Sequence, residues 1–257
     1  MSIIYSYDKT FEGLLTLVFE AYETKKWPTS IVANSHVQQA VFQSVIQVYT
    51  DIGKAKRVYT ALKKKLHPSS FNMVYHVFLS EIEGMEMLLF KYIKQVFDSK
   101  ERIEADFRNE IVLQMLKTER KILREAQRIN MFVRFQKTID DTYFSPYDPQ
   151  YNVLPLVIYH FKDRFADQKW IIYDTLRRYG YYYDLKDVQE ITLDSETINF
   201  VTGKVNAEVL ADGEKDFQRL WKNYFDNIAI KERRNLRLHM QFLPKRFWKY
   251  LPEKQPQ

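Results

Sequence analysis

The chain of 257 residues has no cysteine, only six glycines and eight prolines, and no long apolar run. Without cysteine it has no thiolate nucleophile, no disulfide and no cysteine-held zinc or iron–sulfur site. The scarcity of glycine and proline excludes collagen-like and linker-rich architectures. A membrane helix needs about 20 apolar residues, and the apolar run at residues 14–19 is short and contains Thr16. The first residues also lack the basic start and apolar core of a secretory signal, so we expect a cytoplasmic protein without a membrane segment.

Apolar residues make up 46% of the chain and aromatic residues 16%, which is too much for a disordered protein. The formal net charge is +6, and its distribution is uneven. Residues 231–249 contain seven basic residues against Glu232 alone, so this segment accounts for the whole net charge. Such a concentration of charge predicts a surface that meets an acidic partner such as DNA.

The spacing of the apolar residues predicts an α+β protein that is mainly helical, with a small and mostly antiparallel sheet. Helices are expected at residues 10–25, 51–66, 106–128, 153–165 and 217–228, and two more within 71–97. Strands are expected at residues 3–7, 43–49 and 131–137 and, as a meander, at 170–174, 179–185 and 188–193.

Local signals mark the ends of several elements. Asp8 is the expected cap of the first helix, Gly84 separates two helices, and Pro244 opens the last helix. Residues 145–149 (SPYDP) are expected to form a turn.

A charged, polar stretch at residues 98–110 predicts a boundary between subdomains. It separates an N-terminal α/β subdomain at residues 1–98 from a C-terminal α+β domain at residues 99–257, with one compact unit as the alternative.

Two basic segments are candidates for contact with nucleic acid. Residues 231–249 are one, and residues 117–137, with seven basic residues against two acidic ones, are the other. Arginine binds phosphate with two parallel hydrogen bonds, and aromatic rings stack on unpaired or flipped bases. The alternative is a solvated charged face with Phe247 and Trp248 in the core. The candidate nucleic-acid-binding residues are Arg124, Arg128, Arg134, Arg177, Arg178, Arg233, Arg234, Lys245, Arg246 and Trp248.

The meander suggests a catalytic alternative. Asp174 ends one expected strand, and Asp184 with Lys186 lies on the next, an arrangement similar to the magnesium site of hairpin-based nucleases. The competing interpretation is that both aspartates bond turns or the arginines at positions 177 and 178. The five histidines have no metal-binding spacing, and phosphate-loop and hydrolase motifs are absent, so no metal and no cofactor is expected.

Four segments carry a resemblance to a known family. They are YDKTFEG at residues 7–13, MFVRF at 131–135, FADQ at 165–168 with WIIYD at 170–174, and ERRN at 232–235 with LPKRFW at 243–248. Taken in this order they resemble a bacterial family linked to DNA metabolism and DNA repair, whose domain (4130) has no known function. The similarity extends over nearly the whole chain.

The resemblance implies a process rather than a reaction. Similar proteins occur beside a radical S-adenosylmethionine protein of DNA repair or modification, and some are fused to a uracil-DNA-glycosylase-like domain. This chain has no room for a glycosylase and resembles the stand-alone form. Because it has no cysteine to hold the cluster of a radical enzyme, that chemistry would belong to the partner.

We therefore expect a DNA-associated protein of bacterial DNA repair or base metabolism that assists a radical S-adenosylmethionine partner. Whether it is an enzyme remains open. One alternative is a hydrolase or base-processing enzyme that uses the hairpin at residues 174–186. The other is a protein-interaction module whose basic face meets an acidic protein.

Overall fold

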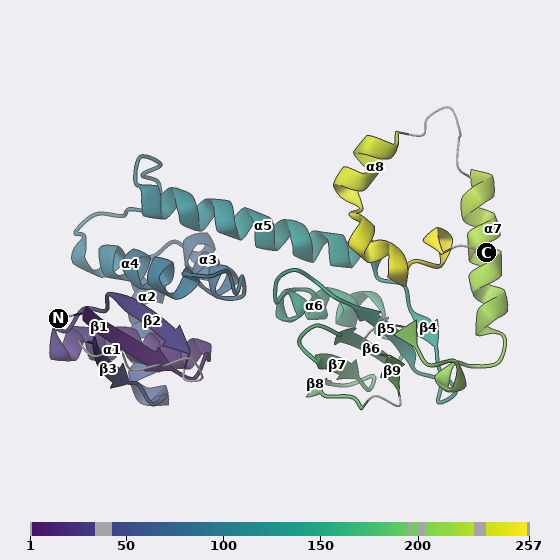
Figure 1. Cartoon of the computed structure of the whole chain (residues 1–257), viewed down its shortest axis with the longest axis horizontal. Coiled ribbons are helices and arrows are strands. Elements are labelled where there is room, and N and C mark those ends of the chain that lie inside the picture. The colour runs from purple at the N-terminus through teal and green to yellow at the C-terminus, as the bar shows by residue number, and fades with distance from the viewer. Residues whose placement is uncertain (1, 34–42, 195–196, 200–203, 229–234, 256–257) are drawn as a thin grey trace. The chain divides into compact units, whose positions relative to one another are not determined.

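The computed structural model describes residues 2–33, 43–194, 197–199, 204–228 and 235–255. It contains two compact units, Met1–Leu123 and Arg124–Gln257, whose helices and strands are labelled in Figure 1. The predicted fold class, α+β and mainly helical, is confirmed. The two units divide within a helix, and the predicted domain boundary at residues 98–99 stays a prediction.

Unit 1 is built on a three-stranded parallel sheet in the order β2–β1–β3. The strands are β1 (Ser2–Tyr7), β2 (Ser30–Ala33) and β3 (Gln43–Gln47), and the helices that follow are α1 (Phe11–Thr24), α2 (Ile52–Lys65), α3 (Pro68–Phe78) and α4 (Met85–Asp98). Tyr5 pairs with Ile31 on one side and with Ile46 on the other. The expectation of mostly antiparallel pairing therefore holds in unit 2 and not in this sheet.

Two helix starts in unit 1 follow from local chemistry. Gly84 adopts a φ of 79° and precedes α4, as its position predicted. The cap of α1, however, is Thr10 and not Asp8, because the Thr10 hydroxyl accepts the N–H of Gly13 at 2.9 Å. Asp8 instead accepts hydrogen bonds from the hydroxyls of Thr10 at 2.7 Å and Thr50 at 2.6 Å. A Cβ atom on Gly13 would lie 2.2 Å from Asp8 Oδ1, so this arrangement requires glycine.

The long helix α5 (Glu110–Phe132) runs across the division between the units. The predicted strand at residues 131–137 is wrong, because Met131 and Phe132 continue the helix and Val133 still donates its N–H to Ile129. Only β4 (Gln136–Lys137) remains of that strand.

Unit 2 contains a five-stranded mixed sheet in the order β4–β5–β6–β7–β8. Its other strands are β5 (Tyr143–Tyr147), β6 (Trp170–Asp174), β7 (Tyr179–Tyr183) and β8 (Val188–Ile191). The predicted meander β6–β8 is confirmed, and α6 (Leu154–Arg164) connects the parallel pair β5 and β6. A short hairpin, β9 (Ile198–Asn199) with β10 (Lys204–Val205), and a 3₁₀ turn η2 (Ala207–Val209) follow.

Strand β5 covers residues that the sequence predicted as a turn. Pro146 lacks an N–H and is usually excluded from a central strand. It is tolerated here because β4 pairs only with Tyr143 and Phe144, so no strand among the described residues pairs with that edge at Pro146.

The C-terminal part of unit 2 consists of α7 (Glu214–Ile228), α8 (Leu236–Phe242) and the 3₁₀ helices η4 (Lys245–Tyr250) and η5 (Pro252–Lys254). Pro244 precedes η4, so the predicted last helix forms as a 3₁₀ helix. No helix in the described parts of the chain is long and apolar enough to span a membrane.

Candidate nucleic-acid interface

Arg246, a predicted DNA contact, holds a buried carboxylate instead of projecting into solvent. Its Nη2 atom lies 2.7 and 2.5 Å from the two oxygens of Glu125, which is only 1% exposed. Arg128 donates to the same carboxylate at 3.3 Å, and the N–H of Gln150 does so at 3.0 Å. A buried charge needs such partners to offset its lost hydration. Arg246 and Arg128 therefore both stabilise the fold.

Two further predicted arginines are held in the same way. Arg177 donates to Asp174 at 2.9 Å and also to the carbonyl oxygen of Pro149 at 3.1 Å. Burial raises the pKa of the fully buried Asp174, and the hydrogen bonds from Arg177 oppose that rise. Arg134 donates to Glu253 through Nε at 3.2 Å and Nη2 at 2.8 Å.

The remaining predicted contacts differ in exposure. Arg124, Arg178 and Lys245 are exposed. Trp248 is half-buried, and its indole N–H donates to the carbonyl oxygen of Leu243 at 3.1 Å. Arg233 and Arg234 lie outside the described residues.

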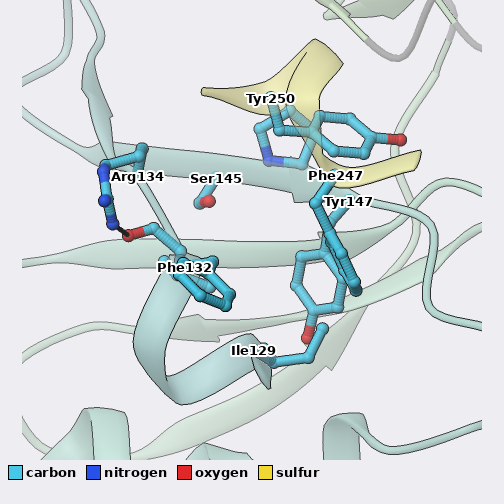
Figure 2. A pocket seen from close by; sticks show the side chains of 9 residues that line it. Ile129, Phe132, Arg134, Ser145, Tyr147, Phe247 and Tyr250 are labelled. Carbon is cyan, nitrogen blue, oxygen red and sulfur yellow. Dashed lines mark hydrogen bonds between the residues drawn. The ribbon is translucent and has the colours of Figure 1, made fainter. Parts of the chain in front are cut away.

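A small cavity lies where η4 packs on the sheet of unit 2. Figure 2 shows the side chains that line it, among them Tyr147, Phe247 and Tyr250. Its volume of about 10 Å³ admits at most one water molecule. Phe247 is buried, as the core interpretation predicted. The C-terminal segment therefore closes the core at this point and leaves no room for a ligand.

The hairpin β6–β7 does not bring the candidate catalytic residues together. The pairing runs from Trp170 opposite Tyr183 to Asp174 opposite Tyr179. Asp174 therefore lies at one end of the hairpin and Asp184 beyond the other, about 17 Å away along the strands. Asp184 accepts the backbone N–H groups of Lys186 at 2.9 Å and Asp187 at 2.8 Å, so it bonds a turn. Within the described ranges no group of three His, Asp or Glu residues is arranged to hold a metal ion.

The exposed cations of unit 1 include a row on α5, which we call the α5 stripe: Lys117, Arg120 and Lys121. Positions three and four apart lie on one face of a helix. The carboxylate of Glu119, which lies between these cations in the sequence, pairs with His76 instead: it accepts a hydrogen bond from His76 Nδ1 at 2.8 Å. None of the three cations forms an ion pair with a described carboxylate.

Unit 2 has a groove of about 910 Å³ along α7, which we call the α7 groove. Its α7 wall presents four large side chains: Phe217, Leu220, Trp221 and Tyr224. The facing wall includes Arg134, Phe135, Lys137 and Tyr143. Sequence periodicity found the apolar stripe of α7, but it could not show that the stripe faces solvent.

Buried and hydrogen-bonded carboxylates fix the walls of the α7 groove. Glu253 accepts hydrogen bonds from Arg134 and, at 2.9 Å, from the indole N–H of Trp221. The Arg134 guanidinium lies 5.5 Å from the centre of the Trp221 ring, within the range of a cation–π interaction. Glu214 accepts the backbone N–H of Lys137 at 3.1 Å and ties α7 to β4. The groove is therefore largely preformed.

One family model matches the chain. It is described as a domain of unknown function (DUF4130) and covers residues 83–253, well over half of the chain. No curated protein and no solved structure matches the chain significantly.

Proposed function

The chain belongs to the family of the domain of unknown function DUF4130, and we propose that it is a DNA-associated protein of bacterial DNA repair or base metabolism. It acts in the cytoplasm and holds DNA for a radical S-adenosylmethionine partner. The order of family motifs in the sequence supports the process. Because the chain has no cysteine, a cysteine-held cluster belongs to the partner.

The observation that carries DNA binding is the α5 stripe. Lys117, Arg120 and Lys121 are exposed on one face of a helix and have no paired carboxylate in the described part of the chain. Their charges are therefore available to phosphates. Each phosphate that a protein neutralises contributes about 0.9 to the dependence of log K on log salt for duplex DNA. Three contacts correspond to a slope of about 2.7.

Four of the predicted DNA-binding arginines are poor choices for a mutational test of DNA binding, because they contribute to the fold. Arg128, Arg134, Arg177 and Arg246 stabilise carboxylates of unit 2. Their removal would weaken the fold, and a loss of DNA binding would then be ambiguous. The α5 stripe avoids this difficulty because its side chains are exposed.

The test is fluorescence anisotropy with labelled duplex and single-stranded oligonucleotides at several salt concentrations. The triple variant Lys117→Ala, Arg120→Ala, Lys121→Ala should bind DNA at least tenfold more weakly at low salt and reduce the salt slope by about 2 to 3. A matched control removes three other exposed cations, Lys100, Arg164 and Lys169, and should retain most of the affinity. If the wild-type protein binds neither oligonucleotide at low salt, the proposal is wrong.

A further inference from the structure

The α7 groove exposes an unusual row of aromatic side chains. Phe217 is 71% exposed, Tyr224 58% and Trp221 40%. They occupy positions i, i+4 and i+7 of one helix, a pattern that normally faces a protein core. Large exposed apolar surfaces of this kind mark binding sites.

The central ring of the aromatic row, Trp221, is held in position by its neighbours. Trp221 is anchored through its indole N–H to Glu253, and its ring centre lies 5.8 Å from that of Tyr224. Phe217 lies one helical turn before Trp221 on the same face of α7. A ring that is already fixed loses little conformational entropy when a ligand stacks on it.

The charges of the groove are nearly balanced and attract an anionic ligand little, because the carboxylate of Glu214 also lines it. Arg134 and Lys137 lie on the wall that faces α7. Each already has a carboxylate partner, Glu253 at 2.8 Å and Asp141 at 2.7 Å respectively. Phosphate attraction alone is therefore weak here, and most of the binding energy must come from the rings.

From these features we propose that the α7 groove binds a short run of unpaired bases of single-stranded DNA by stacking, an inference that rests on the proposed DNA association. Stacking needs free base faces, which a closed duplex does not offer, whereas every unpaired base has two. From Phe217 to Tyr224 the helix rises about 10 Å, so the row of rings offers stacking surfaces to a short stretch of strand. The cations Arg134 and Lys137 on the opposite wall contact the backbone of the strand.

The test compares oligo(dT) with a duplex of equal length. The double variant Phe217→Ala, Tyr224→Ala should weaken oligo(dT) binding at least tenfold and leave duplex binding unchanged. The salt slope should also stay the same, because the lost rings carry no charge. Tyr159→Ala is the matched control: it removes a 72% exposed ring on α6, outside the groove, and should change oligo(dT) affinity less than twofold.

A second readout follows Trp221 directly. Oligo(dT) should quench tryptophan fluorescence in the wild-type protein, and Trp221→Phe, which keeps a ring, should lose most of the quenching while it retains binding within about threefold. Circular dichroism of each variant checks that α7 still folds.

The outcomes separate this inference from the proposed function. Equal affinity for oligo(dT) and duplex, unchanged in the double variant, overturns the stacking site and leaves DNA association standing. Absence of all DNA binding removes both. A concentration-dependent dimer that the double variant abolishes would show that the face binds a second copy. An equal loss of affinity in Tyr159→Ala and in the double variant would show that DNA contacts exposed rings in general. Either of these two results overturns the proposal.

Discussion

Glu253 accepts a hydrogen bond from the Trp221 indole N–H at 2.9 Å, and the same carboxylate is held by Arg134. Glu253 is 8% exposed and lies on η5. One buried acidic residue therefore orients both the central ring of the α7 groove and a cation of its opposite wall. The stacking surface and the fold of the C-terminal segment depend on each other.

Glu253→Gln should loosen this arrangement. The amide can still accept the Trp221 hydrogen bond, but Arg134 loses its charged partner, so we expect a loss of about 1–3 kcal/mol in the free energy of unfolding. Urea denaturation followed by fluorescence measures it. Glu208→Gln, at an exposed glutamate of η2, is the control and should lie within about 0.5 kcal/mol of wild type. Equal stability of the two variants would contradict the positioning role of Glu253.

Glu125→Gln should have a larger effect. It leaves Arg246 and Arg128 partly buried without a carboxylate, and breaking a buried pair typically costs about 3–5 kcal/mol. The exposed pair between Asp216 and Arg219 provides the control, because Asp216→Asn should cost about 0.5 kcal/mol or less. Thermal denaturation of both variants measures the difference. A small effect of Glu125→Gln would mean that water replaces the lost carboxylate.

Gly180→Ala should destabilise the meander of unit 2. A Cβ atom at this position would lie 2.5 Å from the carbonyl oxygen of Ile172 and 2.7 Å from the ring of Tyr173. Because one of these contacts is backbone, the strands must separate, and we expect a loss of about 1–3 kcal/mol. Gly53→Ala in helix α2, where the new atom meets only Asp51 at 3.1 Å, should be neutral or stabilising. Chemical denaturation that ranks the two variants in the opposite order would contradict this packing.

Asp140 should contribute to acid sensitivity. The hydrogen bond from the Thr138 hydroxyl at 2.5 Å lowers the pKa of Asp140 below its usual value. A lowered folded-state pKa stabilises the protein above the unfolded pKa of about 3.9, and this stability is lost as pH falls through the folded pKa. Asp140→Asn should therefore flatten the fall of unfolding free energy between about pH 5 and pH 2.

The measurement is urea denaturation at several pH values. Asp167→Asn, at an exposed carboxylate between α6 and β6, serves as the control and should follow the wild-type curve. A wild-type slope in Asp140→Asn would show that the hydrogen bond has no effect on stability.

The periodic parts of the fold could be predicted from the sequence. Helices α1, α2, α4 and α6 and the β6–β8 meander follow local patterns of apolar residues. Strand β5 could not be predicted, because it overlaps the segment SPYDP at residues 145–149, which is typical of a turn. The strand is acceptable because no described strand pairs with its β4-side edge at Pro146. The end of α5 was predicted wrongly. The alternation in MFVRF at residues 131–135 is typical of a strand, but the first two of these residues are the last two of the helix, which ends at Phe132.

The candidate site was harder to predict than the fold. Arg246 and Glu125 are 121 positions apart, so no local pattern shows that one neutralises the other. Basic residues near the C-terminus therefore had the appearance of a free surface. The stripe on α7 had the opposite problem: periodicity shows which side of a helix is apolar, but not whether another element covers it.

The carboxylate of Glu125 also constrains the order of folding. Arg128 pairs with it within the same helix, but it also joins helix α5 to Gln150 and to Arg246. Its full set of partners is therefore present only after nearly all of unit 2 has been synthesised. The hairpins of the meander connect neighbouring strands and can form early, whereas contacts distant in sequence form late. On the ribosome, unit 2 should therefore remain an incomplete intermediate, with a destabilised end of α5, until η4 emerges.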